Sequence, residues 1–479
     1  MNQKHTPLAD ALLANSQEQF IPFDVPGHKN SIIELQDYFG EKAVFLDKNS
    51  RPGIDFINQP KGVISEAEAL FAEAFRAEDS FFMVGGATSC VHAMIMSVCS
   101  PGDKLIIPRN SHVSCINSTI LSGIIPVYAD PGIDDRLGIS LGTSVESFEN
   151  CIKRNRDAKA IFIINPTYYG ICPDIKTIVE LAHSYGMYVI IDESHGTHFY
   201  FNENMPANAM DSGADLSAVS MHKTGGALTQ AAALLSRGTI PSSHIRSIIS
   251  LLQTTSASYL LMASLDIARK NLYFNGREAV GRSMMYVYNA RTEINKIGGF
   301  YAFDNDILNG NSIYDLDPTK LSINTVGIGL TGSDVYTILN KRYKIQLEFG
   351  DIRNILAIGS VGDKEEYYRS LVSALREISE KYKNTSNTSL HEFDYEYFSP
   401  IIKMLPQMAF YSRKRIIGIW DSVNSISGGF VMCYPPGIPL LAPGELITRS
   451  IVEHIIYAQA EQCDIIGLTP DGNIFIVDQ

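Results

Sequence analysis

Two residues with complementary chemistry follow apolar, strand-like segments of the sequence. Asp192 comes after the run Tyr188–Ile191, and Lys223, 31 residues later, comes after Leu216–Ser220. A lysine amine forms a Schiff base with an aldehyde, and a carboxylate keeps a pyridine nitrogen protonated so that the ring accepts electrons. The pair therefore predicts a site for pyridoxal 5'-phosphate, with Lys223 and Asp192 as its main catalytic residues.

The setting of each residue favours this interpretation over a solvated surface lysine and an ordinary strand-end carboxylate. Gly225, Gly226 and the apolar run Ala231–Leu235 follow Lys223, and a lysine buried there would have a lowered pKa, which suits a Schiff-base amine. Asp192 lies at the edge of a dry core and needs a cationic partner there. A protonated pyridinium would supply that partner.

A glycine-rich turn and a histidine are further candidates for cofactor binding. The turn VGGATSC at 84–90 precedes a helical run, so its backbone N–H groups and the hydroxyls of Thr88 and Ser89 would bind a phosphate. It matches neither GxGxxG nor GxxxxGK[ST], which disfavours a dinucleotide or nucleoside triphosphate. His112 follows the strand-like Lys104–Pro108, where its imidazole would either stack on the cofactor ring or be an ordinary loop histidine.

These candidates depend on a sheet whose strands alternate with helices. The sequence predicts a helix at 175–185 and strands at 104–108, 124–129, 160–165, 187–192, 216–220 and 231–236. Several of the strands are apolar throughout, as expected when both faces of a sheet are covered. This order predicts an α/β fold with a mostly parallel sheet, whose ligands bind at the carboxyl ends of the strands.

The remaining sequence predicts further domains. Helical spacing follows residue 245, and a second α/β segment has strands at 320–326 and 355–360 around a helix at 334–340. A polar stretch at 381–391 is the predicted linker, and a hairpin is expected at 465–477. The predicted division is an N-terminal arm at 1–60, a large cofactor-binding domain at 61–310 and a smaller C-terminal α/β region at 311–479.

The composition is typical of a globular enzyme and disfavours several other classes. The 479 residues are 45% hydrophobic and 19% charged, enough for two or three domains. No apolar run approaches the roughly 18 residues of a membrane helix, and the N-terminus lacks a signal-peptide pattern. The net charge of −13 argues against nucleic-acid binding. Seven scattered cysteines predict reduced thiols in a cytoplasmic protein, and no metal site is expected.

Six motifs extend the argument from single residues to most of the chain. They are PGHK at 26–29, PTYYGICPDIKTIVELAHSYGMYVIIDESHGTHF at 166–199, SMHKTGGALTQAAALL at 220–235, LLQTTSASYLLMASLDIARKNL at 251–272, EFGDIRNILAIGSVGD at 348–363 and YPPGIPLLAPGE at 434–445. Together they resemble the Orn/Lys/Arg decarboxylases, which are pyridoxal-phosphate enzymes of the aspartate-aminotransferase fold. The resemblance runs from about residue 22 to 445 and is more specific than any one motif.

The resemblance implies roles for individual residues. Lys223 would carry the Schiff base, Asp192 would pair with the pyridine nitrogen, and His112 would stack on the ring. The residues implied around the cofactor and its phosphate are Ala87, Thr88, Ser220, His222 and His195. Family members form two-fold dimers with active sites at the interface, so Thr255, within 253–256, would reach the neighbouring subunit's phosphate. Glu348 resembles an acidic position near the substrate entry.

The chain also departs from the family pattern. Met221 stands where threonine is frequent, Val113 stands where lysine is common, and alanines replace frequent serines at Ala227, Ala231 and Ala232. The run Gly85-Gly86-Ala87 replaces a more polar pattern. These changes leave the Schiff-base chemistry in place and leave the choice of substrate open. The chain resembles the compact members without an N-terminal wing, so we expect a homodimer rather than a large ring.

The expected activity is decarboxylation of a basic amino acid, with arginine first and lysine, then ornithine, next. Glu348 and Asp351 are candidates to bind the cationic end of the substrate, although Glu348 would equally form a surface salt bridge. Lys223 or His222 would return a proton to Cα. An aminotransferase or an oxygen-using amino-acid oxidase on the same fold is the main alternative. A catalytically silent relative that acts as a binding or regulatory subunit is the third hypothesis.

Overall fold

The computed structural model describes residues 1–18, 20–383, 400–433, 437–461 and 463–478, and the chain forms two compact units. Unit 1 comprises Met1–Val98, Val189–Val280 and Ser360–Gly362, and unit 2 comprises Cys99–Tyr188, Gly281–Gly359 and Asp363–Gln479. Each unit is assembled from separate parts of the chain, unlike the continuous domains that the sequence suggested, and those domain boundaries stay a prediction. Most of the predicted linker, from residue 384 on, lies outside the described residues.

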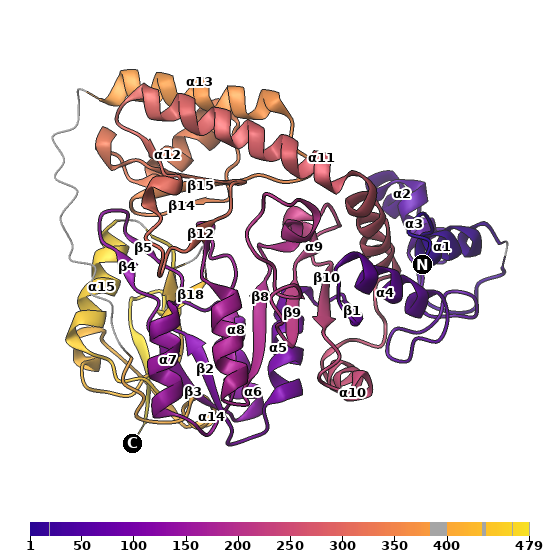
Figure 1. Ribbon diagram of the computed structural model, residues 1–479, viewed down its shortest axis with the longest axis horizontal. Coiled ribbons are helices and arrows are strands. Elements are labelled where there is room, and N and C mark those ends of the chain that lie inside the picture. Colours follow the sequence, from indigo (N-terminus) through magenta and orange to yellow (C-terminus); the bar gives the residue numbers. More distant parts are fainter. Residues whose placement is uncertain (19, 384–399, 434–436, 462, 479) are drawn as a thin grey trace. The chain divides into compact units, whose positions relative to one another are not determined.

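Unit 1 contains strands in the order β1-β10-β9-β8, with helices around them (Figure 1). Strands β8 and β9 are parallel, whereas β10 is antiparallel to both β9 and β1. The elements are α1 (Pro7–Gln17), α2 (Ile33–Phe39), α3 (Glu41–Leu46), α4 (Val63–Ala74), β1 (Asp79–Met83), α5 (Gly86–Val98), β8 (Tyr188–Glu193), β9 (Leu216–Val219), α9 (Met221–Thr224), β10 (Ala232–Ser236), α10 (Ser242–Leu252) and the first part of α11 (Tyr259–Ile297).

The predicted strands of unit 1 are confirmed by the structure. Every residue of β9 and β10 is buried, as are all but the first of β8. Burial on both faces explains why these segments are apolar throughout instead of alternating with polar residues. The antiparallel direction of β10 and the existence of β1 were not evident from the sequence.

A buried ion pair anchors the first residues of the chain to α11. Arg269 has no exposed surface, and its guanidinium donates to the Gln3 carbonyl oxygen at 2.7 Å and to the Asp266 carboxylate at 2.7 Å. The same carboxylate accepts the backbone N–H of Leu8 at 3.0 Å, at the start of α1. Burial, partly offset by these hydrogen bonds, raises the pKa of Asp266.

Replacing Arg269 by alanine should lower the free energy of unfolding by about 3–5 kcal/mol, because it leaves the Asp266 carboxylate buried without its partner. Chemical denaturation measures this loss. Arg277→Ala is the matched control on the same helix, since its ion pair with Glu203 is mostly exposed and should contribute less than about 1 kcal/mol. Equal losses in the two variants would contradict the anchoring role.

Unit 2 contains parallel strands in the order β6-β2-β3, an antiparallel sheet β11-β13-β15-β14 and smaller C-terminal sheets. The elements are β2 (Lys104–Pro108), α6 (Val113–Ser122), β3 (Ile125–Ala129), β4 (Ile133–Asp134), β5 (Ile139–Ser140), α7 (Val145–Arg154), β6 (Ala158–Ile164), β7 (Ile171–Cys172), α8 (Ile175–Ser184), β11 (Tyr301–Ala302), β12 (Asp315–Leu316), β13 (Lys320–Asn324), α12 (Gly332–Ile338), β14 (Phe349–Gly350), β15 (Asn354–Ile358), α13 (Glu365–Tyr382), α14 (Pro406–Tyr411), β16 (Lys414–Ile417), β17 (Val431–Cys433), β18 (Ile438–Leu441), α15 (Arg449–Ala460), β19 (Ile465–Ile466) and β20 (Ile474–Val477).

The hairpin predicted at 465–477 is wrong. Strand β19 pairs with β17, and β20 pairs with β16, so the two strands do not pair with each other. A two-residue strand such as β19 has too little pairing of its own to define a hairpin. The strand that pairs with β19 is β17, which lies more than thirty residues earlier in the chain.

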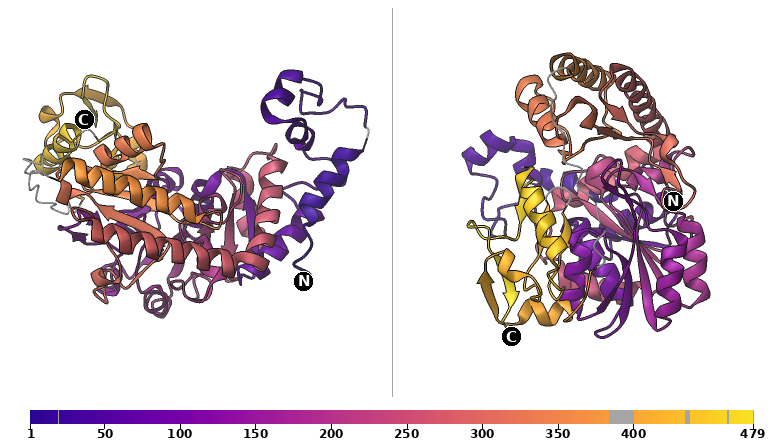
Figure 2. Two further views of the ribbon diagram at one scale, coloured as in Figure 1. Left: turned by 90° about the horizontal axis from the view of Figure 1, so that it is seen from above. Right: turned by 90° about the vertical axis from the view of Figure 1, so that its left-hand side faces the viewer.

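The core of unit 2 joins helices to the antiparallel sheet. Buried side chains of the C-terminal part of α11, such as Val287 and Ile294, share one apolar cluster with Leu321 of β13 and Leu375 of α13. Figures 1 and 2 show α13 running alongside this part of α11. Among the described residues, no helix is both long enough and apolar enough to cross a membrane.

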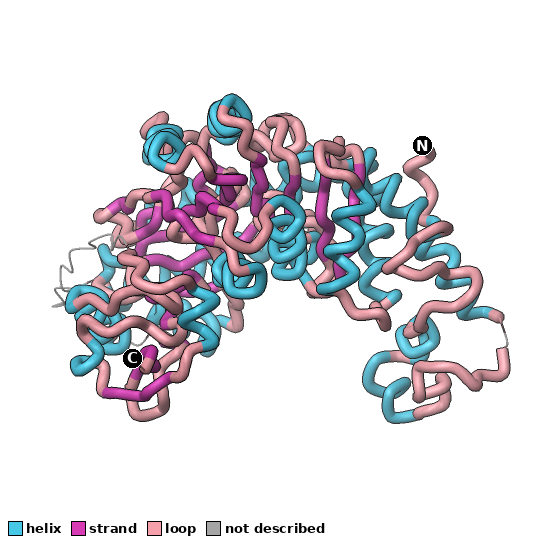
Figure 3. Tube along the Cα trace, turned by 90° about the horizontal axis from the view of Figure 1, so that it is seen from below, coloured by secondary structure: helices cyan, strands magenta, loops and turns pink. Residues whose placement is uncertain are grey.

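The N-terminal segment of unit 1 differs from the rest of that unit. Among the described residues 1–18 and 20–50 there are helices and loops but no strand, as the tube near the N label in Figure 3 shows. Helix α2 has no buried residue at all. The segment therefore has little core of its own beyond the Arg269 anchor and α1.

Candidate active site

The fold of unit 1 places Asp192 and Lys223 at the same edge of the sheet. Asp192 is the penultimate residue of β8, and Lys223 lies in the single-turn helix α9 that follows β9 directly (Figure 1). The parallel register sets Asp192 opposite Ala218 of β9. Both groups thus lie at carboxyl ends of neighbouring strands, where α/β sheets bind ligands.

The amine of Lys223 contacts an imidazole. Its Nζ lies 2.9 Å from Nε2 of His195, which is buried, while Lys223 itself is half-buried. A sequence cannot show this contact, because His195 is on the loop after β8 and Lys223 on the loop after β9. The arrangement gives the amine a neighbouring nitrogen that can take up its proton.

The Asp192 carboxylate is fixed by its own loop. It accepts the backbone N–H of Ser194 at 2.9 Å and also the Ser194 hydroxyl, and the residue is 8% exposed. Burial and the Asp192 charge raise the pKa of the Cys90 thiol on α5. The carboxylate therefore lies close to the first turns of α5.

The predicted phosphate turn forms the start of α5. Gly86, its first residue, has a φ of +74°, which favours glycine. A Cβ on Gly85 would lie 2.7 Å from Oγ of Ser89. The first N–H groups of a helix have no partner within it and bind anions well. Ala87 is half-buried and Thr88 exposed, whereas the Ser89 hydroxyl donates to the Gly86 carbonyl oxygen at 2.8 Å.

Gln253 holds this turn from the side. Its Oε1 accepts the backbone N–H of Val84 at 3.0 Å, and its Nε2 donates to the Phe82 carbonyl oxygen at 3.3 Å. The side chain of Gln253 thus continues the pairing of β1 up to the glycines. Thr255, two residues further on, is exposed.

If this turn binds the phosphate of the predicted pyridoxal-phosphate cofactor, replacing Gly86 by alanine should weaken cofactor binding by roughly 5- to 30-fold. A side chain in the left-handed backbone region costs about 1–2 kcal/mol, and relief of that strain would turn the N–H groups away. Titration of the apoenzyme with cofactor measures the change. Gly53→Ala is the control in the same unit, since Gly53 also has a positive φ and open space around it. A Gly53 variant that lost cofactor affinity equally would contradict the assignment.

The loop that carries Lys223 is closely packed. Ser220 is buried, and its Oγ lies 3.3 Å from Nδ1 of the half-buried His222. A Cβ on Gly225 would lie 3.0 Å from the Met221 carbonyl oxygen and 3.1 Å from the Thr197 methyl group. Close packing of α9 against the loop after β8 therefore favours glycine at position 225.

The other three predicted site residues lie in unit 2. His112 caps the N-terminus of α6, and its Nδ1 accepts the backbone N–H of Ser114 at 3.2 Å, so the neutral ring carries its proton on Nε2. Glu348 is exposed. Asp351 accepts the Tyr169 hydroxyl and the backbone N–H groups of Arg353 and Asn354. Burial, only partly offset by those donors, raises its pKa.

Arg109 was not recognised from the sequence as a site-building residue. Its buried guanidinium donates to the Glu445 carboxylate at 3.0 Å and to the Leu440 carbonyl oxygen at 3.1 Å. The backbone N–H of Val113, next to His112, donates to the Gly437 carbonyl oxygen at 3.1 Å. The C-terminal motif that ends in Glu445 is thereby fixed to the loop that carries His112.

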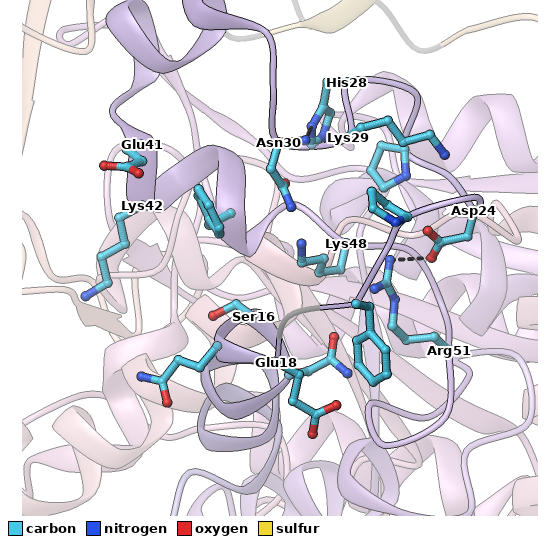
Figure 4. A pocket seen from close by; sticks show the side chains of 16 residues that line it. Ser16, Glu18, Asp24, His28, Lys29, Asn30, Glu41, Lys42, Lys48 and Arg51 are labelled. Carbon is cyan, nitrogen blue, oxygen red and sulfur yellow. Dashed lines mark hydrogen bonds and ion pairs between the residues drawn. The ribbon is translucent and has the colours of Figure 1, made fainter.

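A cavity of about 640 Å³ lies within the N-terminal segment of unit 1, between residues 15 and 51 (Figure 4). Lys48 points into its centre, and Arg51 pairs with Asp24 at 2.6 Å on one side. Burial and the neighbouring Arg51 charge lower the pKa of Lys48. None of the predicted site residues lines this cavity.

Comparisons with known proteins found a matching family model, similar sequences and similar structures. Residues 6–367 match the family model described as the Orn/Lys/Arg decarboxylase major domain. The chain is 40% identical over 459 residues to a protein of Bacillus subtilis named arginine decarboxylase, covering 95% of this chain and 94% of the relative. It is 41% identical over 457 residues to an arginine decarboxylase of Halalkalibacterium halodurans, covering 95% and 93%. The crystal structure of a Francisella novicida lysine decarboxylase shares the fold, with a TM-score of 0.86 at 19% identity over 99% of this chain and 81% of that one.

Proposed function

Since the chain belongs to the Orn/Lys/Arg decarboxylase family, we propose that it uses pyridoxal phosphate to decarboxylate L-arginine to agmatine. The observation that carries the proposal is the placement of Lys223 and Asp192 at the carboxyl ends of neighbouring strands in unit 1. Arginine is preferred to lysine or ornithine because the relatives at about 40% identity are named arginine decarboxylases.

The residues of unit 1 fit pyridoxal phosphate. Gly85 and Gly86 leave the backbone at the start of α5 bare, with N–H groups available for a phosphate. The buried Asp192 carboxylate is held by donors on one side and suits a protonated pyridine nitrogen. Lys223 would hold the cofactor covalently, whereas the stacking role of His112, which belongs to unit 2, stays a prediction from the family resemblance.

When bound, the cofactor supplies a ring that accepts the electron pair released as CO2 leaves Cα. Lys223 must be neutral to react as a nucleophile, and His195 Nε2, 2.9 Å away, would accept the proton that Nζ gives up. The Asp192 charge would keep the pyridine nitrogen protonated throughout turnover. Lys223 or His222, both on α9, would then donate a proton to Cα.

Glu348 and Asp351 are the two acidic candidates to bind the guanidinium of the substrate. The hydrogen bonds that Asp351 already accepts favour Glu348 for this role. The oxygens of Asp351 already accept a tyrosine hydroxyl and two backbone N–H groups, so the carboxylate has little capacity left. Glu348 is exposed on unit 2. We assign the substrate contact to Glu348 and a structural role in its loop to Asp351.

The proposal is tested by product analysis with purified protein, added pyridoxal phosphate and arginine, lysine or ornithine in separate reactions. We expect CO2 and agmatine from arginine, with the other two amino acids reacting more slowly. Cadaverine or putrescine as the main product would change the substrate. A keto acid, or ammonia and hydrogen peroxide, would support the aminotransferase or oxidase alternative, and absent turnover with bound cofactor would support a regulatory relative.

The active assembly is proposed to be a homodimer in the cytoplasm. Apolar side chains gather on the N-terminal segment, where Phe23 is 93% and Tyr38 89% exposed. A seven-residue helix such as α2, without buried residues, is unstable unless another surface covers it. We assign that covering surface to a second copy of this chain. The seven cysteines, all free thiols in the structure, suit a reducing compartment.

Replacing both Phe23 and Tyr38 by aspartate should raise the dissociation constant of the dimer by about a thousandfold, because buried aromatic anchors contribute about 2 kcal/mol each. Light scattering coupled to size exclusion over a dilution series measures the mass. Tyr273→Asp, at a half-exposed position of α11 in the same unit, is the control. A double variant that dimerises like the wild type would place the interface elsewhere.

A further inference from the structure

A second buried carboxylate follows Asp192 and joins separate segments of unit 1. Glu193, the last residue of β8, has no exposed surface. Its Oε2 accepts the Tyr200 hydroxyl at 2.5 Å and the Ser217 hydroxyl at 2.7 Å, and its Oε1 accepts the backbone N–H of Ala209 at 2.8 Å. Burial of a carboxylate is costly unless donors surround it, and these donors come from three different parts of the chain.

The Glu193 side chain does not share the face of Asp192. Successive side chains of a strand point to opposite faces of its sheet, so Asp192 and Glu193 lie on opposite faces of β8. Asp192 is the predicted partner of the pyridine nitrogen. Any influence of Glu193 on the chemistry must therefore act through the residues that its carboxylate holds in place.

One of these donors belongs to the loop that carries His195. Tyr200 lies in the 3-10 helix η1 (Thr197–Phe201), which follows β8. The backbone carbonyl oxygen of Glu193 accepts the N–H of Gly196 at 2.8 Å, while its carboxylate accepts the Tyr200 hydroxyl. Burial and the Glu193 charge raise the pKa of Tyr200 well above its ordinary value, so the hydroxyl stays a donor. Glu193 thus binds the loop after β8 beyond His195 as well as at its start.

Another donor belongs to the strand that leads to Lys223. Ser217 lies in β9, and β9 is followed directly by α9, which carries Lys223 (Figure 1). The Thr197 hydroxyl of η1 also donates to the carbonyl oxygen of Ser220 at 3.2 Å, just before α9. The loop after β8 and the loop after β9 are therefore joined to each other as well as to Glu193.

We propose that Glu193 is a positioning residue for the Lys223 amine. Its carboxylate holds both the loop of His195 and the strand before Lys223, and so it sets the 2.9 Å contact between Nε2 and Nζ. An amine that adds to an aldehyde must release a proton, and an imidazole at hydrogen-bond distance accepts it. Maintenance of that distance makes Lys223 a faster nucleophile. The importance of this contact for turnover rests on the proposed decarboxylase function, whereas the reactivity of the amine in the cofactor-free protein does not.

Reductive methylation of the full-length, cofactor-free protein tests the proposal without turnover. A limiting amount of formaldehyde with cyanoborohydride methylates amines through addition to an aldehyde, and mass spectrometry of the peptides gives the rate at Lys223 relative to the exposed Lys61. Tyr200→Phe removes the hydroxyl that Glu193 accepts. We expect the ratio to fall by about three- to tenfold, because loss of one tether permits part of the roughly 1 Å displacement that can cost about a hundredfold.

Tyr259→Phe is the matched control for Tyr200→Phe. Tyr259 is also buried in unit 1, and its hydroxyl donates to the Asp55 carbonyl oxygen at 2.6 Å. The control variant should be labelled like the wild type. Thermal unfolding followed by circular dichroism checks that each variant is folded at the labelling temperature.

Ser217→Ala tests the same carboxylate from the side of β9. It should lower the ratio in the same direction as Tyr200→Phe. Ser80→Ala is its control, since the Ser80 hydroxyl is also buried in unit 1 and donates to the Glu68 carbonyl oxygen at 2.6 Å. An unchanged ratio in both donor variants, or an equal fall in the controls, would overturn the proposal.

Two substitutions of Glu193 itself separate position from charge. Glu193→Gln should keep the ratio within about twofold of the wild type, because hydroxyls accept as well as donate and can bind the amide NH2 while its oxygen accepts the Ala209 N–H. Glu193→Ala removes every contact of the carboxylate and should lower the ratio at least as far as Tyr200→Phe. If Glu193→Gln were labelled as slowly as Glu193→Ala, charge rather than position would be responsible. The expected labelling pattern in a protein that releases no CO2 from arginine, lysine or ornithine would contradict the proposed function and support the positioning role.

Discussion

Alanine at position 223 should abolish turnover and remove the visible absorbance of lysine-linked cofactor at the same time. The variant lacks the Lys223 amine, which helix α9 places beside His195. Removal of a covalent nucleophile costs on the order of 10⁴-fold or more in kcat. The amount of CO2 released in a fixed time measures turnover, and absorbance spectroscopy of the reconstituted protein measures the lysine-linked cofactor.

Borohydride reduction adds a readout that does not depend on activity. It should attach the cofactor permanently to Lys223 in the wild type, visible as a mass increase on the peptide that contains this residue. Lys61→Ala removes an exposed lysine of unit 1 and should retain activity, absorbance and labelling. Turnover near the wild-type level in Lys223→Ala, or labelling of another lysine, would refute the assignment.

Asparagine at position 192 should slow turnover by roughly 10²- to 10³-fold while the lysine-linked absorbance persists. The amide is nearly isosteric with the carboxylate but carries no charge to hold a proton on the pyridine nitrogen. Loss of one preorganised electrostatic contact at a reacting group has about this effect. The split between kcat, which should fall, and cofactor attachment, which should remain, distinguishes this result from loss of folding.

Ser194→Ala is the matched control for Asp192→Asn. It removes one donor from the carboxylate and leaves both the charge and the backbone N–H donor of residue 194 in place. We expect less than about a tenfold loss in kcat, since one neutral hydrogen bond contributes about 1 kcal/mol. If Ser194→Ala were as slow as Asp192→Asn, carboxylate orientation rather than charge would be the main contribution.

Patterns within a few residues determined much of this protein without any tertiary information. Apolar runs identified all six strands predicted between 104 and 236, because strands covered on both faces have no polar alternation. The order of strands and helices then located Asp192 and Lys223 at strand ends. The helix start at Asp174, whose side chain accepts the Thr177 N–H, was equally local.

Contacts between distant segments were decided only by the tertiary structure. His195 and Lys223 come within 2.9 Å because β8 and β9 are neighbours in register, and Arg109 reaches Glu445 across 336 positions of the chain. Asp351 has the residue type of a substrate ligand, yet its oxygens accept donors of its own unit. A residue's type and its neighbours in sequence do not encode which distant donor will satisfy it.

The C-terminal sheets show the same division. The segments at 465–466 and 474–477 have strand composition, and the sequence alone determined that much. Their partners, β17 and β16, were decided by packing, since two-residue and four-residue strands gain stability only from the sheet that accepts them.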